Sequence, residues 1–212
     1  GGHTHDGLPQ PLIVGKTIIV NSGSHGKFLS RLDLDVRGGR IADYRYKLLP
    51  VLSRYIPEDR EMARLIAQIR GPHESRLSEG LAISETLLYR RGNFNGSFAE
   101  IILDALLKRS DAEVAFSPGF RWGVTIVPGQ AITLDDVYSH TALTYPNTWV
   151  RQLAGAEIHH IMEDVADNLF HKDAYYRQGG DMVRMGGLTY AIDIGKDMGK
   201  RMASVKAAVD LD

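Results

Sequence analysis

The apolar residues of this 212-residue chain change their spacing along its length, and this change limits the folds that the chain can adopt. Over residues 26–48, apolar and polar side chains alternate on both sides of Gly38-Gly39, as in two antiparallel strands joined by a tight turn. Over residues 57–71, apolar side chains recur every three or four residues, as in an amphipathic helix. Because strand and helix patterns then follow each other without regular alternation, the sequence predicts an α+β fold.

The helix predicted over 57–70 divides the chain. Pro57 is placed at its first helical position, and Gly71-Pro72 ends it. We therefore predict three parts: residues 1–52, a linker helix within 53–80, and a second unit over 81–212. The apolar face of the linker helix is predicted to comprise Met62, Leu65, Ile66 and Ile69.

The second unit contains three predicted helices. Ser97 and Glu100 predict a capping box for a helix over 97–110, and Thr133 is predicted to cap a short helix. A longer helix is predicted over 155–170. The inward face of the helix over 97–110 is predicted to comprise Phe98, Ile101, Ile102, Ala105 and Leu106.

Composition excludes several classes of function. A net charge of −1 gives no overall attraction to nucleic acid or to a membrane surface, and no apolar run is long enough to span a bilayer. The chain has no cysteine, which excludes disulfides and thiolate ligands and leaves the cellular compartment open. A metal site would therefore use His, Asp, Glu, Asn or water.

Two histidines near the start of the chain are candidate metal ligands. In a strand, His3 and His5 would point to the same side and could reach one metal ion or two adjacent ions. The alternative is a pair of exposed histidines at a chain end, since two ligands are too few for a metal centre. His25, between glycines, is either a supporting residue behind such a site or a structural histidine.

Two segments of the second unit could bind an anion or another ligand. Arg121 lies at the tip of the SPGFRWG turn after a short strand, where its guanidinium could meet an anion or simply be solvated. Arg90 and Arg91 precede a helix N-terminus and are either anion-binding residues or a charged strand end. A glycine-rich loop follows the last helix and is predicted to bind a ligand rather than form a plain turn. Its candidate substrate-binding residues are Tyr175, Gly179, Gly180, Asp181 and Arg184.

The motifs occur together in an order that resembles a known family. The segments GGHTHDG, NSGSHGKFLSRLDLDV, GNFNGSF, SPGFRWG, YSHTALTYPNTW and QGGDMVRMGGLTY are similar to those of the 5'-nucleotidase family of dimetal phosphoesterases. The last three segments resemble its thiosulfohydrolase branch (the SoxB group), which acts in bacterial sulfur oxidation. The resemblance covers essentially the whole chain.

The resemblance implies an architecture. Residues 1–52 would be the end of a metallophosphoesterase β-sandwich domain, and residues 81–212 a substrate-binding α/β domain with mixed sheets flanked by helices. The family's other metal motifs lie upstream of the first of these segments, and its members continue past the last. We therefore expect an internal fragment that is inactive alone.

The resemblance also implies a chemistry. His3 and His5 would bind two manganese ions together with upstream ligands, and Arg121 would neutralise the substrate oxyanion as a catalytic and binding residue. The reaction would remove a sulfonate, as sulfate, from a cysteine S-thiosulfonate. The partner would be the SoxYZ carrier protein in the periplasm, with no nucleic acid or membrane involved.

Two other functions stay open. A 5'-nucleotidase or nucleotide-sugar hydrolase would need two aromatic side chains to hold the base. Tyr175 matches one of these, whereas a rough alignment puts Leu143 at the other, with Tyr145 nearby. The second alternative is a binding module for substrate or carrier without catalysis.

Overall fold

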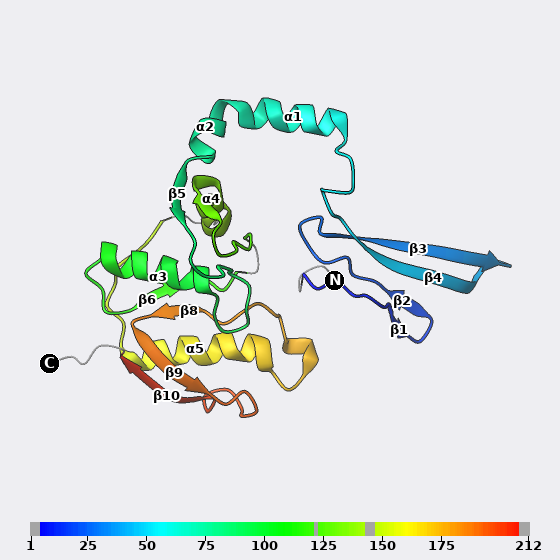
Figure 1. Ribbon diagram of the computed structural model, residues 1–212. Coiled ribbons are helices and arrows are strands. Elements are labelled where there is room, and N and C mark those ends of the chain that lie inside the picture. Colours follow the sequence, from blue (N-terminus) through cyan, green and yellow to red (C-terminus); the bar gives the residue numbers. More distant parts are fainter. Residues whose placement is uncertain (1–4, 121–122, 143–146, 208–212) are drawn as a thin grey trace. The chain divides into compact units, whose positions relative to one another are not determined.

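The computed structural model describes residues 5–120, 123–142 and 147–207. The chain separates into two compact units, Gly1–Pro72 and His73–Asp212. Figure 1 labels the helices and strands of each unit. This division falls inside the predicted linker of 53–80, and the three-part domain assignment stays a prediction. No helix in the described ranges is long and apolar enough to cross a membrane.

Unit 1 consists of two β-hairpins and a helix. Strands β1 (Leu12–Val14) and β2 (Thr17–Ile19) pair antiparallel, as do β3 (Phe28–Arg37) and β4 (Arg40–Pro50). The longer hairpin turns at Gly38 and Gly39, whose φ angles of 56° and 74° are those of a tight hairpin turn. The predicted hairpin is confirmed.

Helix α1 (Arg60–Arg70) begins three residues later than predicted. The Asp59 carboxylate accepts a hydrogen bond from the Met62 backbone N–H at 2.8 Å, so Asp59 rather than Pro57 starts the helix. Its apolar face is 47–62% exposed at the four predicted residues, Met62, Leu65, Ile66 and Ile69. A short 3-10 turn, η1 (Gly71–His73), and helix α2 (Glu74–Leu77) follow.

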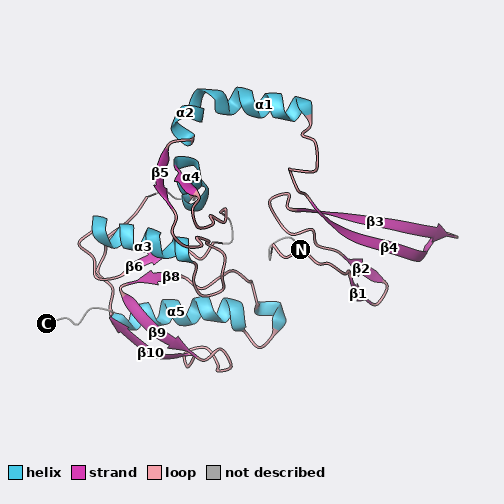
Figure 2. Cartoon of the chain, in the orientation of Figure 1, coloured by secondary structure: helices cyan, strands magenta, loops and turns pink. Residues whose placement is uncertain are grey.

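Unit 2 mixes helices with three two-stranded antiparallel sheets (Figure 2), which confirms the α+β class. The sheets pair β5 (Gly80–Ile83) with β7 (Ala131–Thr133), β6 (Ala115–Ser117) with β8 (Arg184–Gly186), and β9 (Leu188–Ile192) with β10 (Met202–Ala207). After α2, the helices in the described part of unit 2 are α3 (Ser97–Arg109), α4 (Leu134–Thr141), α5 (Gly155–Phe170) and the 3-10 turn η2 (Ala174–Tyr176).

Helix caps were predicted correctly at α4 but not at α3. Thr133 and Asp136 form a capping box at α4, as its sequence indicates. At α3 the N-cap is Gly96, and the Ser97 hydroxyl instead donates to the Leu87 carbonyl at 2.7 Å. The predicted capping box is therefore wrong, because Ser97 serves a contact with a segment ten residues away.

The buried face of α3 is also rotated from the predicted one. Ile101 is 45% exposed and Ala105 is exposed, whereas Ala99 and Leu103 are buried beside the correctly predicted Phe98. Helix α3 packs against β6 and β8, where Leu103 lies over Gly186. Phe98 joins Leu88 and Ile126 in one core cluster. A second core cluster lies between α5 and β9–β10 and comprises Met162, Ala166, Met182 and Met202.

Candidate functional site

The turn after β6 is held by a buried arginine. Arg90 Nη2 donates to the Ser117 hydroxyl and to the Pro118 carbonyl, both at 3.3 Å, and the guanidinium lies 5.2 Å from the centre of the Phe120 ring. Burial, and then the charge of Arg184, lower the pKa of Arg90 to about 10, so it stays cationic at neutral pH. Arg121 and Trp122 lie outside the described residues.

Gly119 allows the same turn to lie directly on the glycine-rich loop. A Cβ at Gly119 would come within 2.3 Å of the Met182 carbonyl oxygen and 2.9 Å of Asp181 Cβ. Such distances are far below van der Waals contact, so any other residue would push the two segments apart. The turn and the loop, which are about 60 residues apart in the sequence, are thus in direct contact.

The described chain resumes at Gly123, which lies next to His140. The His140 ring is fully buried and stacks on Phe98, with ring centroids 3.6 Å apart. A Cβ at Gly123 would lie 2.6 Å from His140 Nδ1, and Gly123 has φ +105°. Burial, followed by the charge of Arg90, lowers the pKa of His140 to about 4, so the ring is neutral at pH 7.

The glycine-rich loop is fixed by a buried ion pair. Arg184 Nη2 lies 3.2 Å from Asp181 Oδ2 with both side chains out of contact with solvent, and Arg184 also donates to the Gly92 carbonyl. Burial lowers the pKa of Arg184, while Asp181 opposes that shift. In these contacts Arg184 holds the loop against residues 90–92. Gly179 and Gly180 have positive φ angles of 78° and 110°, which glycine adopts without strain.

Exposed aromatic side chains lie beside this loop in the sequence. Tyr175 is 87% exposed, and its ring meets that of Tyr176 nearly at right angles, with centroids 5.4 Å apart. Phe94 stacks on Phe170 at the end of α5, with centroids 5.8 Å apart. Tyr175 is therefore available to a ligand. Leu143 and Tyr145, the candidates for a second aromatic position, lie outside the described residues.

Two residues of this arrangement escaped the sequence analysis. The sequence predicts Arg90 to be either an anion-binding residue or a charged strand end, and His140 to lie at the surface or to anchor a loop, whereas His140 is fully buried. Each acts on partners 27 to 50 residues away in the sequence, so no local pattern announces it. The substrate-binding roles of Arg121, Tyr175, Gly179, Gly180, Asp181 and Arg184 stay predictions.

The metal ligands predicted in unit 1 are only partly described, since His3 lies outside the described residues. His5 has φ +61°, and its ring meets that of His25 edge-on with centroids 5.8 Å apart. No group of three or more His, Asp or Glu side chains in the described parts could hold a metal ion. These residues therefore do not form a metal centre by themselves.

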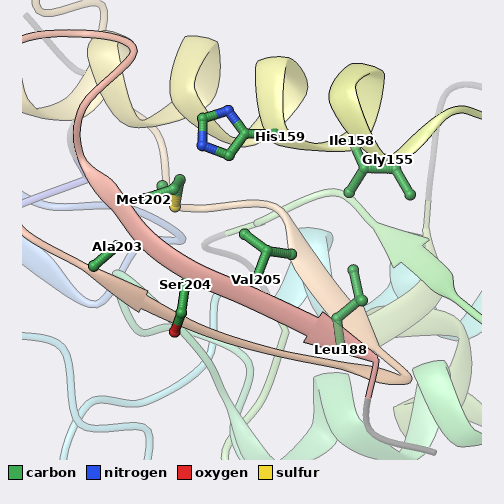
Figure 3. Close-up of a pocket in the computed structure, with 8 residues that line it drawn as sticks. All are labelled: Gly155, Ile158, His159, Leu188, Met202, Ala203, Ser204 and Val205. Carbon is green, nitrogen blue, oxygen red and sulfur yellow. The ribbon is translucent and has the colours of Figure 1, made fainter.

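A hollow of about 490 Å³ lies elsewhere in unit 2, between α5 and β9–β10. Figure 3 shows Met202 and Val205 pointing toward α5, whereas Ser204 points away from it. Its lining contains none of the predicted site residues. It also lacks the converging polar groups of a typical ligand site, so it is not the candidate site.

Both protein families and solved structures give matches to this chain. Residues 80–212 match the family described as "5'-nucleotidase, C-terminal domain". No curated protein sequence matches the chain.

Among solved structures, the Thermus thermophilus sulfate thiohydrolase SoxB, in complex with glycerol, is 42% identical with a TM-score of 0.92, covering 97% of this chain and 38% of that one. A 5'-nucleotidase precursor, also from Thermus thermophilus, is 21% identical with a TM-score of 0.77, covering 99% and 45%. The chain thus spans less than half the length of either protein. The second match shows the fold alone.

Proposed function

Because this chain belongs to the family of 5'-nucleotidase C-terminal domains, we propose that it is the substrate-binding part of a metal-dependent hydrolase that releases sulfate from a cysteine S-thiosulfonate. The choice of this substrate over a nucleotide is supported by the 42% identity to the sulfate thiohydrolase across 97% of the chain. The nucleotidase precursor shares half that identity. The observation that carries the proposal is the direct contact of the Gly119 turn with the Asp181 loop.

Anion recognition is assigned to Arg121. The planar guanidinium forms paired hydrogen bonds with two oxygens of a tetrahedral oxyanion, and a sulfonate presents such oxygens as a phosphate does. Arg90 places a buried positive charge behind the turn, whereas the charge of Arg184 is balanced by Asp181. The field of Arg90 lowers the energy of a bound anion and of the negative charge that develops when water attacks its sulfur.

The carrier is assigned to the glycine-rich loop. Gly179 and Gly180 leave the backbone without side chains, so an extended peptide could approach it closely. The exposed ring of Tyr175 offers a flat surface for that peptide. The proposed partner is the SoxYZ carrier protein, and the proposed location is the periplasm.

We assign the metal chemistry to a site for which the described residues supply too few ligands. His3 and His5 would supply two ligands for two manganese ions, and the remaining ligands would come from residues outside this sequence. Such a metal pair, when bound, supplies a nucleophilic hydroxide at neutral pH. Since the described residues do not form that centre, the proposal includes that this chain alone does not turn over substrate.

A 5'-nucleotidase function is the second candidate. The 87% exposure of Tyr175 favours it, because a free aromatic face could stack on a nucleobase. It requires a second aromatic surface on the other side of the base.

Titration calorimetry of the chain with three ligands distinguishes the candidates. These are a Gly-Gly-Cys-Gly-Gly peptide bearing the S-thiosulfonate, the same peptide with a free thiol, and adenosine monophosphate. We expect binding of the first alone, weakened about tenfold or more by Arg121→Ala and unchanged by Arg109→Ala, a control at the exposed end of α3. Binding of adenosine monophosphate alone would reject the thiosulfonate in favour of the nucleotide.

A further inference from the structure

Two charged residues of the glycine-rich loop lie beneath its surface. The Arg184 side chain is 0% exposed and that of Asp181 is 2% exposed, whereas the backbone just before them, Gly179-Gly180, is only half-buried. A ligand that approaches the loop therefore meets the glycine backbone first, and it reaches neither charged side chain unless the loop opens. The pair can act on a ligand only through the backbone that it holds.

One nitrogen of Arg184 joins the loop to a distant segment. Its Nη2 lies 3.2 Å from Asp181 Oδ2 and also donates to the backbone carbonyls of Arg90, at 3.4 Å, and Gly92. These two carbonyls belong to residues that stand 94 and 92 positions earlier in the sequence. The planar guanidinium suits such a task, because it presents several donors in a fixed arrangement that the single ammonium group of lysine does not reproduce.

Backbone hydrogen bonds fix both ends of the loop. The Gly179 N–H donates to the carbonyl of Asn168, in the last turn of α5, at 3.1 Å. The Met182 N–H donates to the Asn93 carbonyl at 2.8 Å. The loop is thus anchored on α5 at one end and on the segment before α3 at the other.

The backbone between these two anchors is held by a side chain. Gly180 has φ +110°, and a glycine restricts its own backbone less than any other residue. Asp181 is the residue between the anchors that carries a side chain, and its carboxylate is directed to Arg184. The ion pair therefore restrains the part of the loop that the backbone hydrogen bonds at its ends leave to glycine.

The geometry points to Asp181 and Arg184 as a pair of positioning residues: by tying the middle of the loop to the carbonyls of Arg90 and Gly92, they set the backbone conformation of Gly179-Gly180 and so the affinity of the loop for the peptide around the modified cysteine. This inference rests on the carrier-binding function proposed above for the loop. Neither side chain touches the substrate. A backbone that is already ordered loses less conformational freedom when a peptide binds to it, so binding is tighter.

Two ligands separate positioning from direct contact. The first is the Gly-Gly-Cys-Gly-Gly peptide bearing the S-thiosulfonate, and the second is N-acetylcysteine amide bearing the same group without flanking glycines. Titration calorimetry of the full chain gives the Kd of each. A residue that contacts the sulfonate would change both Kd values, whereas a pair that positions the peptide-binding backbone changes that of the pentapeptide alone.

The test variant is Asp181→Asn/Arg184→Met, which removes both charges and so leaves no buried charge without compensation. Asp181→Asn alone, which preserves the size of the side chain, covers the case in which the double variant fails to fold. We expect the Kd of the pentapeptide to rise about tenfold and that of the small ligand to stay within about twofold. Hydrogen exchange of the Gly179 and Met182 amides is expected to accelerate, because the loop opens more readily.

The matched control is Glu163→Ala. It removes two hydrogen bonds from the β9–β10 hairpin of the same unit and so lowers stability away from the loop. Both Kd values are expected to equal those of the wild type. A tenfold rise in the pentapeptide Kd with this variant would show that any loss of stability weakens binding, and it would overturn the positioning role.

The remaining outcomes are also decisive. If a folded Asp181 variant binds the pentapeptide as the wild type does, or if both Kd values rise by the same factor, Asp181 and Arg184 are not positioning residues, and the proposed function is unaffected. If the wild type binds neither ligand, the proposed function fails. Exchange of the Gly179 amide then decides separately: acceleration in the double variant supports the hold of the pair on the loop, and unchanged exchange overturns it.

Discussion

Arg184 Nη2 lies 3.2 Å from Asp181 Oδ2, and neither side chain is more than 2% exposed. Removing one member of a buried ion pair leaves the other charge without compensation, which costs about 3–5 kcal/mol. We therefore predict that Asp181→Asn lowers the free energy of unfolding of unit 2 by about that amount. Urea unfolding followed by tryptophan fluorescence measures it, because both tryptophans lie in unit 2.

The matched control is an exposed ion pair in the same unit. Lys172 Nζ lies 2.6 Å from Asp197 Oδ1, with both side chains about two-thirds exposed at 70% and 67%. Solvent screens such a pair, so Asp197→Asn is expected to leave the urea midpoint unchanged. Equal effects of Asp181→Asn and Asp197→Asn would contradict the buried role of Asp181.

Gly119→Ala is predicted to damage the contact between the turn and the glycine-rich loop. The new methyl group would lie 2.3 Å from the Met182 carbonyl oxygen, so the two backbones must separate. The expected loss of stability is about 1–3 kcal/mol, accompanied by weaker binding of the thiosulfonate peptide. Gly155→Ala is the control, since a Cβ there meets nothing within 4 Å at the start of α5, and a small gain in stability is expected. Thermal unfolding of both variants gives the comparison.

Glu163 is predicted to hold the β9–β10 hairpin on α5. Its buried carboxylate accepts hydrogen bonds from the backbone N–H groups of Gly199 at 2.8 Å and Met202 at 2.7 Å. Glu163→Ala would leave two donors unpaired, at about 1–3 kcal/mol for each buried one. Hydrogen exchange of the Met202 amide should accelerate strongly. Asp164→Ala, at an exposed position of the same helix, should leave that amide protected.

The sequence predicted local structure well where a local signal determines it. Gly38-Gly39 requires the positive φ angles of a hairpin turn, and Thr133 caps the helix that immediately follows it. Prediction from the sequence failed where a side chain contacts a residue that is distant in the sequence. Ser97 bonds to Leu87 instead of capping α3, and the packing of α3 on β6 and β8 buries Leu103 rather than Ile101.

The candidate site shows the same division. The glycine-rich loop was identified from its own composition, and the Asp181–Arg184 pair has a spacing of three that the sequence displays. The burial of that pair depends on the carbonyls of residues 90–92, almost a hundred positions earlier. The burial of His140 could not be predicted, because the residues that pack against its ring, Phe98 and Gly123, are distant from it in the sequence.

Burial of His140 predicts a pH dependence of stability. Its pKa is lowered from 6.5 to about 4 in the folded chain, so the unfolded chain binds more protons between these values. The contribution is fully present above pH 6.5 and is lost as the pH falls toward 4, on the order of 2–3 kcal/mol. Urea unfolding of unit 2 at pH 7, 6, 5 and 4.5 measures the slope. His140→Phe should reduce it, and an identical slope in that variant would contradict the assignment.

The metal content of the chain decides how much of the proposed centre it contains. The described residues offer the His5 ring, with His25 beside it, and no group of three ligands. Manganese binds tightly only where several imidazole and carboxylate groups converge. We therefore predict that the purified chain, loaded with manganese and freed of excess, retains essentially none by elemental mass spectrometry. The His3→Ala/His5→Ala variant should give the same result. If the wild type keeps one or two ions that the variant loses, further ligands within the sequence complete the site, and the chain must then be assayed for hydrolysis in its own right.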